Sequence, residues 1–149
     1  MIAMFDGEYA FLSNFESSPF TADGATFPTV EHWFQAFKTL DPVEFREIAA
    51  ADTPGRAKRM GRHVTLRPDW EEVKVDVMRE GLRKKFAIPR FRAMLLATGD
   101  EELMEGNTWH DNTWGNCVCQ KCQNTPGRNM LGMLLMEIRN EIRYEIAGQ

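Results

Sequence analysis

The chain has 149 residues, a length typical of one domain that builds its own hydrophobic core. Hydrophobic residues make up 43% of the chain and charged residues 27%, which excludes a disordered chain or one embedded in a membrane as a whole-chain description. The net charge of −4 argues against a protein that coats DNA and limits any nucleic-acid binding to a local patch. We therefore expect a single domain over residues 1–149.

Localisation is inferred from what the sequence does not contain. No basic and apolar leader opens the chain, and no apolar run reaches the length of about 18 residues that a membrane-spanning helix needs. The three cysteines are clustered and odd in number, which fits a reducing compartment better than a disulfide framework. These features predict a cytoplasmic protein without a membrane partner.

The first quarter of the chain predicts a small antiparallel sheet. Residues 8–15 mix aromatic and polar side chains, as in a strand that ends in a loop. Between the short segments 19–22 and 25–27, Asp23-Gly24 can adopt the positive φ angles of a two-residue hairpin turn.

Helices are predicted for most of the remaining chain. Thr29, Asp41-Pro42 and Thr53-Pro54 have the chemistry of helix N-termini, and Gly61 and Gly99 have that of helix ends. A weakly patterned segment, 103–109, is the only further strand candidate. The helices are expected at about 30–39, 41–51, 53–60, from Asp69 onward, 89–98 and 127–146. The fold class is therefore α+β, a mainly helical single domain with a small antiparallel sheet.

The helix from Val30 to Lys38 is the first candidate site. Its apolar residues share one side, while Glu31, Gln35 and Lys38, at positions i, i+4 and i+7, share another. Two interpretations are open: a solvent-exposed polar face above an aromatic core, or a carboxylate, an amide and an amine that project together into a pocket.

A loop-like segment, 109–116, is the second candidate. Trp109 and Trp114 flank Asp111 in a context rich in Asn and Gly. Aromatic walls with one carboxylate suit a sugar or a base, since stacking supplies contact area and the acid supplies direction. A tryptophan-anchored loop that packs on the core is the alternative.

The cysteines form the third candidate. Cys117, Cys119 and Cys122, with His110 upstream, could supply the four sulfur and nitrogen ligands of one structural Zn²⁺. The spacing is more compact than the usual two separated pairs, so three reduced, partly buried thiols are the alternative.

One basic cluster stands out in this acidic chain. Arg56, Lys58, Arg59 and Arg62 surround the helix that Thr53-Pro54 begins. Such clusters are usually solvated helix faces, and the sharper interpretation is a phosphate site.

Taken in order, these segments resemble a known family, the NADAR family, also called the YbiA-like N-glycosidases. The resemblance extends from about Phe5 to Arg139. It is carried by Phe11–Phe15, Phe27–His32, Gln35, Lys38, Gly61-Arg62, Leu95–Gly99, Trp109, Asp111, Trp114-Gly115 and Asn129–Gly132. The cysteine cluster, which lies between the last two motifs, departs from the barest form of the family pattern.

The resemblance implies a hydrolase that cleaves the bond between C1 of a ribose and an exocyclic amine. It implies as substrate either ADP-ribose on guanine bases of DNA or a ribosylaminopyrimidine phosphate of riboflavin synthesis. Some members of the family act as antitoxins, so a toxin is a possible partner, but the sequence does not identify one. A non-catalytic, zinc-stabilised module that binds a nucleotide or a partner is the alternative function.

The chemistry of that reaction then suggests a role for each matching residue. Glu31 would be the general acid and base, and Lys38 either a nucleophile at C1 or a fixed charge on a phosphate. Asp111 would hold ribose hydroxyls or orient water. No metal is required for this chemistry. Substrate-binding roles would fall to Asn14, Phe15, Gln35, Arg62, Trp109, Trp114 and Asn129.

Overall fold

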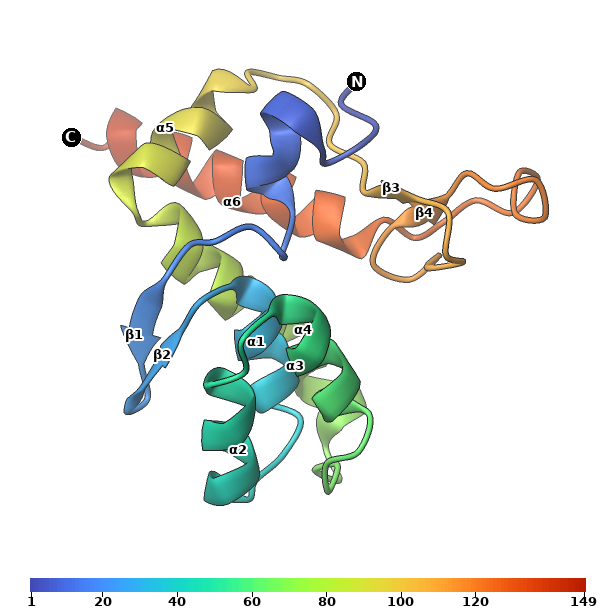
Figure 1. The fold of residues 1–149 in the computed structure, drawn as a ribbon. Coiled ribbons are helices and arrows are strands. Elements are labelled where there is room, and N and C mark those ends of the chain that lie inside the picture. The colour runs from blue at the N-terminus through green and yellow to red at the C-terminus, as the bar shows by residue number, and fades with distance from the viewer. The chain divides into compact units, whose positions relative to one another are not determined.

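The computed structural model describes residues 1–149 and contains six α-helices, one 3₁₀ helix and two small sheets (Figure 1). The prediction of a mainly helical α+β protein with a small antiparallel sheet is confirmed. Packing divides the chain into a central unit, Asn14–Lys85, and a terminal unit made of Met1–Ser13 and Phe86–Gln149. One domain over the whole chain stays a prediction. None of the helices has the length and apolar character needed to cross a bilayer.

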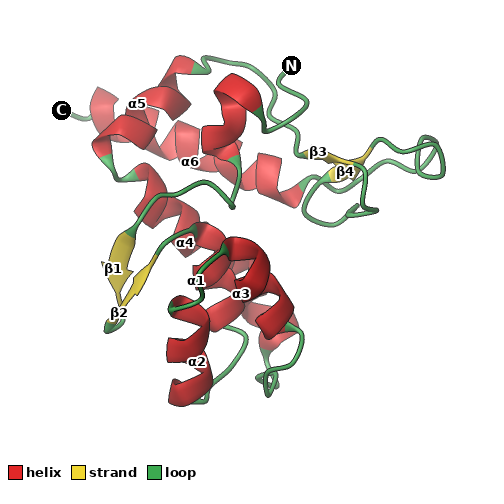
Figure 2. Cartoon of the chain, in the orientation of Figure 1, coloured by secondary structure: helices red, strands yellow, loops and turns green.

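The central unit begins with a hairpin and continues through helices (Figure 2). Its last helix, α4, reaches one residue past the unit, to Phe86. The elements are β1 (Phe20–Ala22), β2 (Ala25–Phe27), α1 (Val30–Ala36), α2 (Pro42–Ala49), α3 (Pro54–Gly61) and α4 (Trp70–Phe86).

The hairpin forms as its turn residues predict. β1 and β2 pair antiparallel, with Phe20 opposite Phe27 and Ala22 opposite Ala25. Asp23 and Gly24 have φ angles of 52° and 78°, the left-handed values that a two-residue turn with the twist of a sheet requires.

Side-chain caps begin three of the helices, as predicted. The hydroxyl of Thr29 accepts a hydrogen bond from the backbone N–H of His32, and Asp41 and Thr53 cap α2 and α3 in the same way. Helices α1 and α2 end two or three residues earlier than predicted, whereas α3 ends one residue later, at Gly61. The α-helical part of α1 ends at Ala36, and Lys38 lies in a following turn, where its N–H donates to the carbonyl of Gln35 at 3.2 Å.

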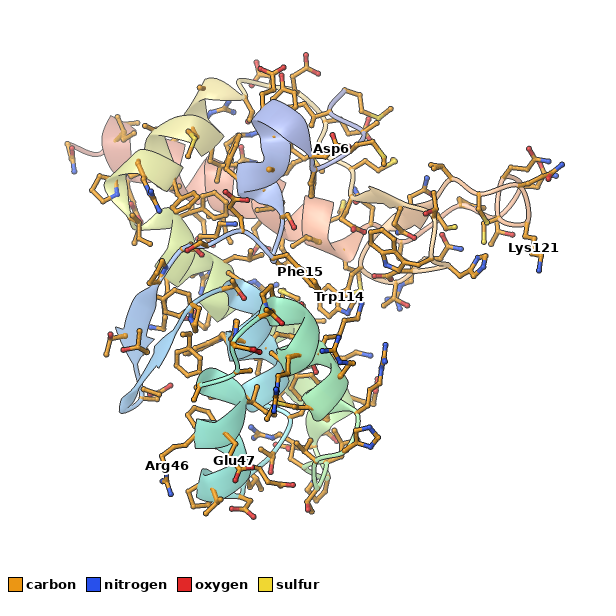
Figure 3. The ribbon with its side chains drawn as sticks, in the orientation of Figure 1. Asp6, Phe15, Arg46, Glu47, Trp114 and Lys121 are labelled. Carbon is orange, nitrogen blue, oxygen red and sulfur yellow. The ribbon has the colours of Figure 1, made fainter.

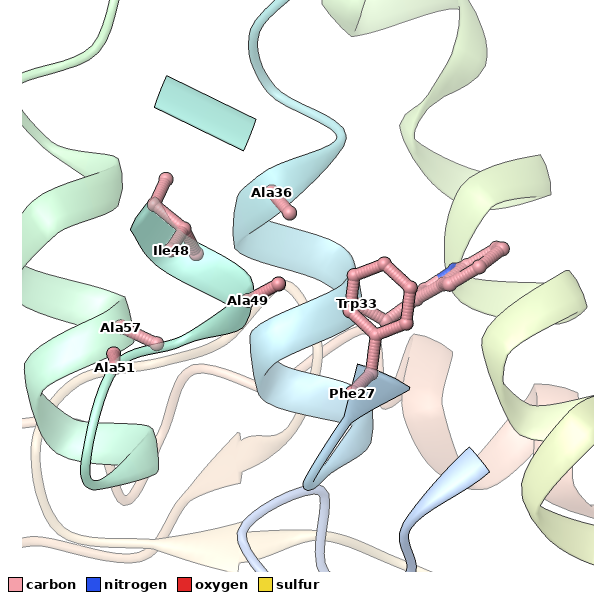
Figure 4. Packing of buried hydrophobic residues seen from close by; sticks show 7 residues of the cluster. All are labelled: Phe27, Trp33, Ala36, Ile48, Ala49, Ala51 and Ala57. Carbon is pink, nitrogen blue, oxygen red and sulfur yellow. The ribbon is translucent and has the colours of Figure 1, made fainter. Parts of the chain in front are cut away.

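Aromatic rings and alanines form the core of the central unit (Figure 4). The rings of Phe27 and Trp33 meet edge to face with centroids 5.1 Å apart. Ala36 of α1 and Ala57 of α3 are fully buried, and such small side chains let two helices approach closely. The close packing of α1 on α3 places the polar edge of α1 beside α3.

The terminal unit packs α5 (Pro89–Ala97) against α6 (Met130–Ala147) and against the 3₁₀ helix η1 (Gly7–Leu12). The second sheet of the protein lies in this unit and is a two-residue parallel ladder of β3 (Gly106–Asn107) and β4 (Asn116–Cys117). The predicted apolar stripe of the last helix is buried, at Leu131, Leu134, Leu135, Ile138 and Ile142.

Three predictions about the terminal unit need correction. The predicted strand over 8–15 is wrong, since Gly7, at φ 54°, leads into η1 and the adjacent residues Phe11 and Leu12 are both buried. The strand candidate 103–109 reduces to β3 and a single bridge. The last helix begins at Met130 rather than at 127, because Asn129 has a left-handed φ of 49°.

Candidate active site

Glu31 and Gln35 form the centre of the candidate site in the central unit. Both side chains are buried, with 7% and 4% of their surface exposed, so this edge of α1 is not a solvated face. The Nε2 of Gln35 donates a hydrogen bond of 2.8 Å to Oε1 of Glu31. One turn of helix separates the two residues, which makes this contact a direct product of their i, i+4 spacing.

Gly61 of α3 makes room for the Gln35 amide. A β-carbon at position 61 would lie 2.8 Å from Cδ of Gln35 and closer still to its Oε1. Gly61 is the last residue of α3, so the predicted helix end at this glycine is confirmed, although Gly61 does not have the positive φ of a left-handed cap. Its function is steric, and it positions Gln35 and through Gln35 the carboxylate of Glu31.

Lys38 is half-buried on the same side of α1. Its Nζ lies 5.9 Å from the ring centroid of Phe34, and its carbonyl accepts a hydrogen bond of 2.8 Å from the N–H of Arg67. Burial lowers the pKa of the Lys38 amine, Glu31 raises it in part, and the cations of Arg62 and Lys58 lower it further. The net lowering favours the neutral, nucleophilic amine.

Two cations, Lys58 of α3 and Arg62 directly after that helix, thus act on Lys38. Arg62 was predicted from the sequence, whereas Lys58 was known only as a member of the basic cluster. The i, i+4 spacing of the two would have identified Lys58 as its partner. The Nζ of Lys58 lies 6.0 Å from the ring centroid of Phe15, which is 44% exposed. Lys38, Lys58 and Arg62 together give the site a local positive charge.

Asn14 adjoins the first turn of α1, since its carbonyl accepts the N–H of Glu31 at 3.1 Å. Its side chain is buried, and the Nδ2 donates to Sδ of Met78 at 3.4 Å. The Oδ1 has no hydrogen-bond partner in the protein. A buried acceptor without a donor is costly, so this oxygen is suited to receive a hydroxyl or an amine of a ligand.

In the terminal unit, Asp111 organises the second candidate segment. Its Oδ1 accepts the N–H groups of Thr113 and Trp114 at 3.0 and 2.9 Å. Its own N–H donates to Oδ1 of Asn107 at 3.1 Å. Asn107 is fully buried and was missed, because a lone Asn before a loop carries no sequence signal. These bonds engage Oδ1 and the backbone N–H of Asp111, and its contact with a ligand stays a prediction.

The other predicted residues of this unit have different surroundings. Trp109 is 59% exposed, so it does not anchor a core, whereas Trp114 is partly buried (Figure 3). The amide of Asn129 is engaged with backbone, donating to the carbonyl of Leu103 and accepting from the N–H of Glu105. This contact indicates a structural role, and its substrate-binding role stays a prediction.

His110 and the three cysteines come together in space as predicted. Their ligand atoms all lie within 4.8 Å of one another, and Nδ1 of His110 is 3.8, 3.4 and 3.4 Å from Sγ of Cys117, Cys119 and Cys122. Burial raises the pKa of the Cys117 thiol, but hydrogen bonds from its neighbours outweigh burial and lower it to about 6. The cluster therefore has the ligand set for a metal ion.

The structure sorts the predicted site residues by unit. The central unit holds Asn14, Phe15, Glu31, Gln35, Lys38 and Arg62, and the terminal unit holds Trp109, Asp111, Trp114 and Asn129. Within each unit, the residues that the sequence pattern groups are neighbours. Their joint action on one substrate stays a prediction.

Known proteins resemble this chain over most of its length. It is 44% identical over 141 residues to N-glycosidase YbiA of Escherichia coli, covering 93% of this chain and 84% of that protein. N-glycosidase Npun_R5314 of Nostoc punctiforme is 41% identical over 91% of this chain and 86% of its own. Riboflavin biosynthesis protein VVA0006 of Vibrio vulnificus is 37% identical, over 93% of this chain and 37% of its own length.

A solved structure and a family model agree with these matches. The NMR structure of the E. coli protein YbiA superposes with a TM-score of 0.84 at 40% identity, covering 100% of this chain and 89% of that one. The expected N-glycosidase class agrees with the names of the relatives. The NADAR domain model matches residues 4–143, and the chain belongs to the NADAR family.

Proposed function

We propose that this protein is an N-glycosidase that hydrolyses the bond between C1 of a ribose and an exocyclic amine. One observation carries this proposal: the carboxylate of Glu31 is buried on the side of α1 that faces α3, and the Lys38 amine, whose pKa is lowered, lies near it. The names of the relatives support the same reaction class. The proposed substrates are ADP-ribosylated guanine in DNA and a ribosylaminopyrimidine phosphate, and a relative named for riboflavin biosynthesis supports the second.

The proposed first step is displacement at C1. Protonated Glu31 gives its proton to the exocyclic nitrogen, which takes the electron pair of the breaking C1–N bond and leaves as a neutral amine. The lone pair of Lys38 Nζ forms the new bond to C1, and the nitrogen loses a proton to the Glu31 carboxylate. Gln35 holds the carboxylate through its hydrogen bond to Oε1.

The proposed second step releases the sugar. Glu31 then gives its proton to the ring oxygen of the ribose, which takes the electron pair of the breaking bond to C1 and leaves an iminium between C1 and Lys38 Nζ. Water adds to C1 of this iminium and loses a proton to the Glu31 carboxylate. Loss of the amine returns Lys38 and the free sugar. The sum is hydrolysis, so the reaction consumes no oxidant or reductant. Asn14 Oδ1, which lacks a donor, and Asp111 Oδ2 are the proposed acceptors for ribose hydroxyls.

Both proposed substrates carry phosphate, and the cations of the site match that charge. Lys58 of α3 and Arg62, the residue after α3, act on Lys38. Arg62 is exposed and able to meet a phosphate in two-point contact. In the other role considered for Lys38, its amine is a third phosphate ligand and water attacks C1 directly.

Incubation with each substrate, followed by assay of the released base and sugar, tests the proposed reaction. Borohydride added during turnover should reduce the iminium and attach the sugar to Lys38, as peptide mass spectrometry would show. Lys38→Ala and Lys38→Arg should both lose turnover if Lys38 attacks C1, whereas activity retained in Lys38→Arg would make it a phosphate ligand. Lys74→Ala is the control, because Lys74 only pairs with exposed Glu71.

A non-catalytic binding module is the competing function, and the cysteine cluster is the feature that favours it. Saturable binding of both compounds with no release of base would establish that function and reject the enzyme. For the cluster itself we propose a structural role as the site of one Zn²⁺, outside the chemical step.

A further inference from the structure

We propose that His110, Cys117, Cys119 and Cys122 bind one Zn²⁺ and that this ion holds the loop that carries Asp111. The distances from the His110 nitrogen to the three sulfur atoms fit a tetrahedral site. With Zn–N of about 2.1 Å and Zn–S of about 2.3 Å, a nitrogen and a sulfur ligand lie roughly 3.5 Å apart. The Nδ1 of His110 is 3.4 Å from both Cys119 and Cys122 Sγ and 3.8 Å from Cys117 Sγ.

The donor set selects the class of metal. Three thiolates and one imidazole suit Zn²⁺ in a closed structural site, whereas Mg²⁺ and Ca²⁺ take oxygen ligands. All four ligand atoms come from this chain, so no coordination position is left for a substrate.

The backbone around the cluster is arranged for ligation. His110 has a φ of 68°, a left-handed conformation that is uncommon for non-glycine residues, although histidine is one of the residue types that adopt it more often. Cys119 and Cys122 are the ends of a tight turn, in which the N–H of Cys122 donates to the carbonyl of Cys119 at 3.1 Å. Cys117 lies in β4 and is buried. Lys121 marks the outer end of this loop (Figure 3).

The same residues connect the cluster to Asp111. His110 directly precedes Asp111, and Asn112 Oδ1, on its other side, accepts the N–H of Cys117 at 2.8 Å. An ion bound to both His110 and Cys117 therefore cross-links the two ends of the segment that contains the Asp111 turn. Asp111 is thereby positioned by the metal. Its contact with ribose rests on the proposed function, whereas the metal site does not.

Metal content is the first test. Protein purified without chelator should contain about one zinc per chain by elemental analysis. His110→Asn and Cys122→Ser should lose the zinc, and His63→Asn, at an exposed histidine of the central unit, should keep it. Asn is chosen at position 110 because it tolerates the left-handed backbone. Co²⁺ reconstitution should give the absorption bands of a tetrahedral thiolate site in wild type but not in Cys122→Ser.

Amide exchange tests the connection to Asp111 without any substrate, so it is independent of the enzymatic proposal. Zinc removal should speed exchange at the N–H groups of Thr113 and Trp114, which Asp111 holds, and leave α1 protected. Unchanged exchange there would refute the positioning of Asp111. Metal-free protein with three freely titrating thiols, a native disulfide, or iron in place of zinc would each reject the zinc site.

Discussion

The amide of Gln35 occupies the space that a β-carbon on Gly61 would require. This contact joins α1 to α3 at the candidate carboxylate, because the other end of the same amide donates to Glu31. The steric fit of a glycine therefore controls the placement of a buried acid on a different helix.

Gly61→Ala should reduce both activity and stability. The added methyl group must displace Gln35, so we expect kcat/KM to fall by roughly 10–100-fold and the free energy of unfolding by about 1–3 kcal/mol. Gly55→Ala is the control on the same helix, since its β-carbon would meet no atom closer than 3.7 Å. Kinetics and urea denaturation of both variants provide the measurement, and equal behaviour of the two would contradict this role.

His32 should make stability depend on pH. Its Nε2 is 2.9 Å from the carbonyl of Ala51, and its Nδ1 is 2.8 Å from the hydroxyl of Thr29. Burial lowers the pKa of His32 below 6.5, although the Ala51 contact opposes this shift. The unfolded chain therefore binds a proton more readily, so this contribution to stability is present above pH 6.5 and is lost as the pH falls through the folded pKa.

This effect is measured as the urea concentration at the midpoint of unfolding, determined at several values between about pH 5 and pH 8, which bracket the pKa of histidine. His32→Gln should flatten the acid limb of the profile, because an amide can make both contacts without titrating. His63→Gln, at an exposed position, should leave the profile as in wild type. A His32→Gln profile with the wild-type slope would assign the loss to other groups.

Asp111→Asn should separate charge from structure. An Asn Oδ1 can still accept the N–H groups of Thr113 and Trp114, so the free energy of unfolding should change by less than about 1 kcal/mol. The lost charge should lower kcat more than it raises KM. Asp111→Ala, which also loses the turn, should in addition speed amide exchange at residues 113 and 114. Unaltered kinetics in Asp111→Asn would reduce Asp111 to a structural residue.

Trp109→Ala should weaken substrate binding without unfolding the protein. Its side chain is 59% exposed, so stability should stay within about 0.5 kcal/mol of wild type. A stacked base contributes about 1–3 kcal/mol, which predicts a rise in KM of roughly 5–150-fold. Tyr144→Ala, which removes an aromatic side chain 85% exposed, is the control. A KM equal to that of the control would exclude Trp109 from the site.

Local features were predictable because their cause is local. The caps at Thr29 and Thr53 and the Asp23-Gly24 turn use contacts within a few residues, and the structure confirms each. The strand prediction for the segment 8–15 is wrong because its aromatic and polar residues have no clear period. The packing of η1 on α5, a contact distant in sequence, decides its conformation.

The candidate site divides in the same way. The spacing of Glu31 and Gln35 predicted that they share one face of a helix, and their hydrogen bond follows from that placement. The role of Gly61 could not be read from its position at a helix end, because the Gln35 amide that requires it comes from another helix. Asn107 was beyond prediction for the same reason, since it holds Asp111 only after the loop has closed.

The hydrogen bonds of the Asn129 side chain have a consequence for the order of folding. Asn129 directly precedes α6, but its side chain does not cap that helix. Its amide instead bonds Leu103 and Glu105, which are 26 and 24 residues away in sequence. Ordering a loop of this length costs chain entropy before its contacts repay it. We expect the first turn of α6 to form late, after the apolar stripe further along the helix has docked.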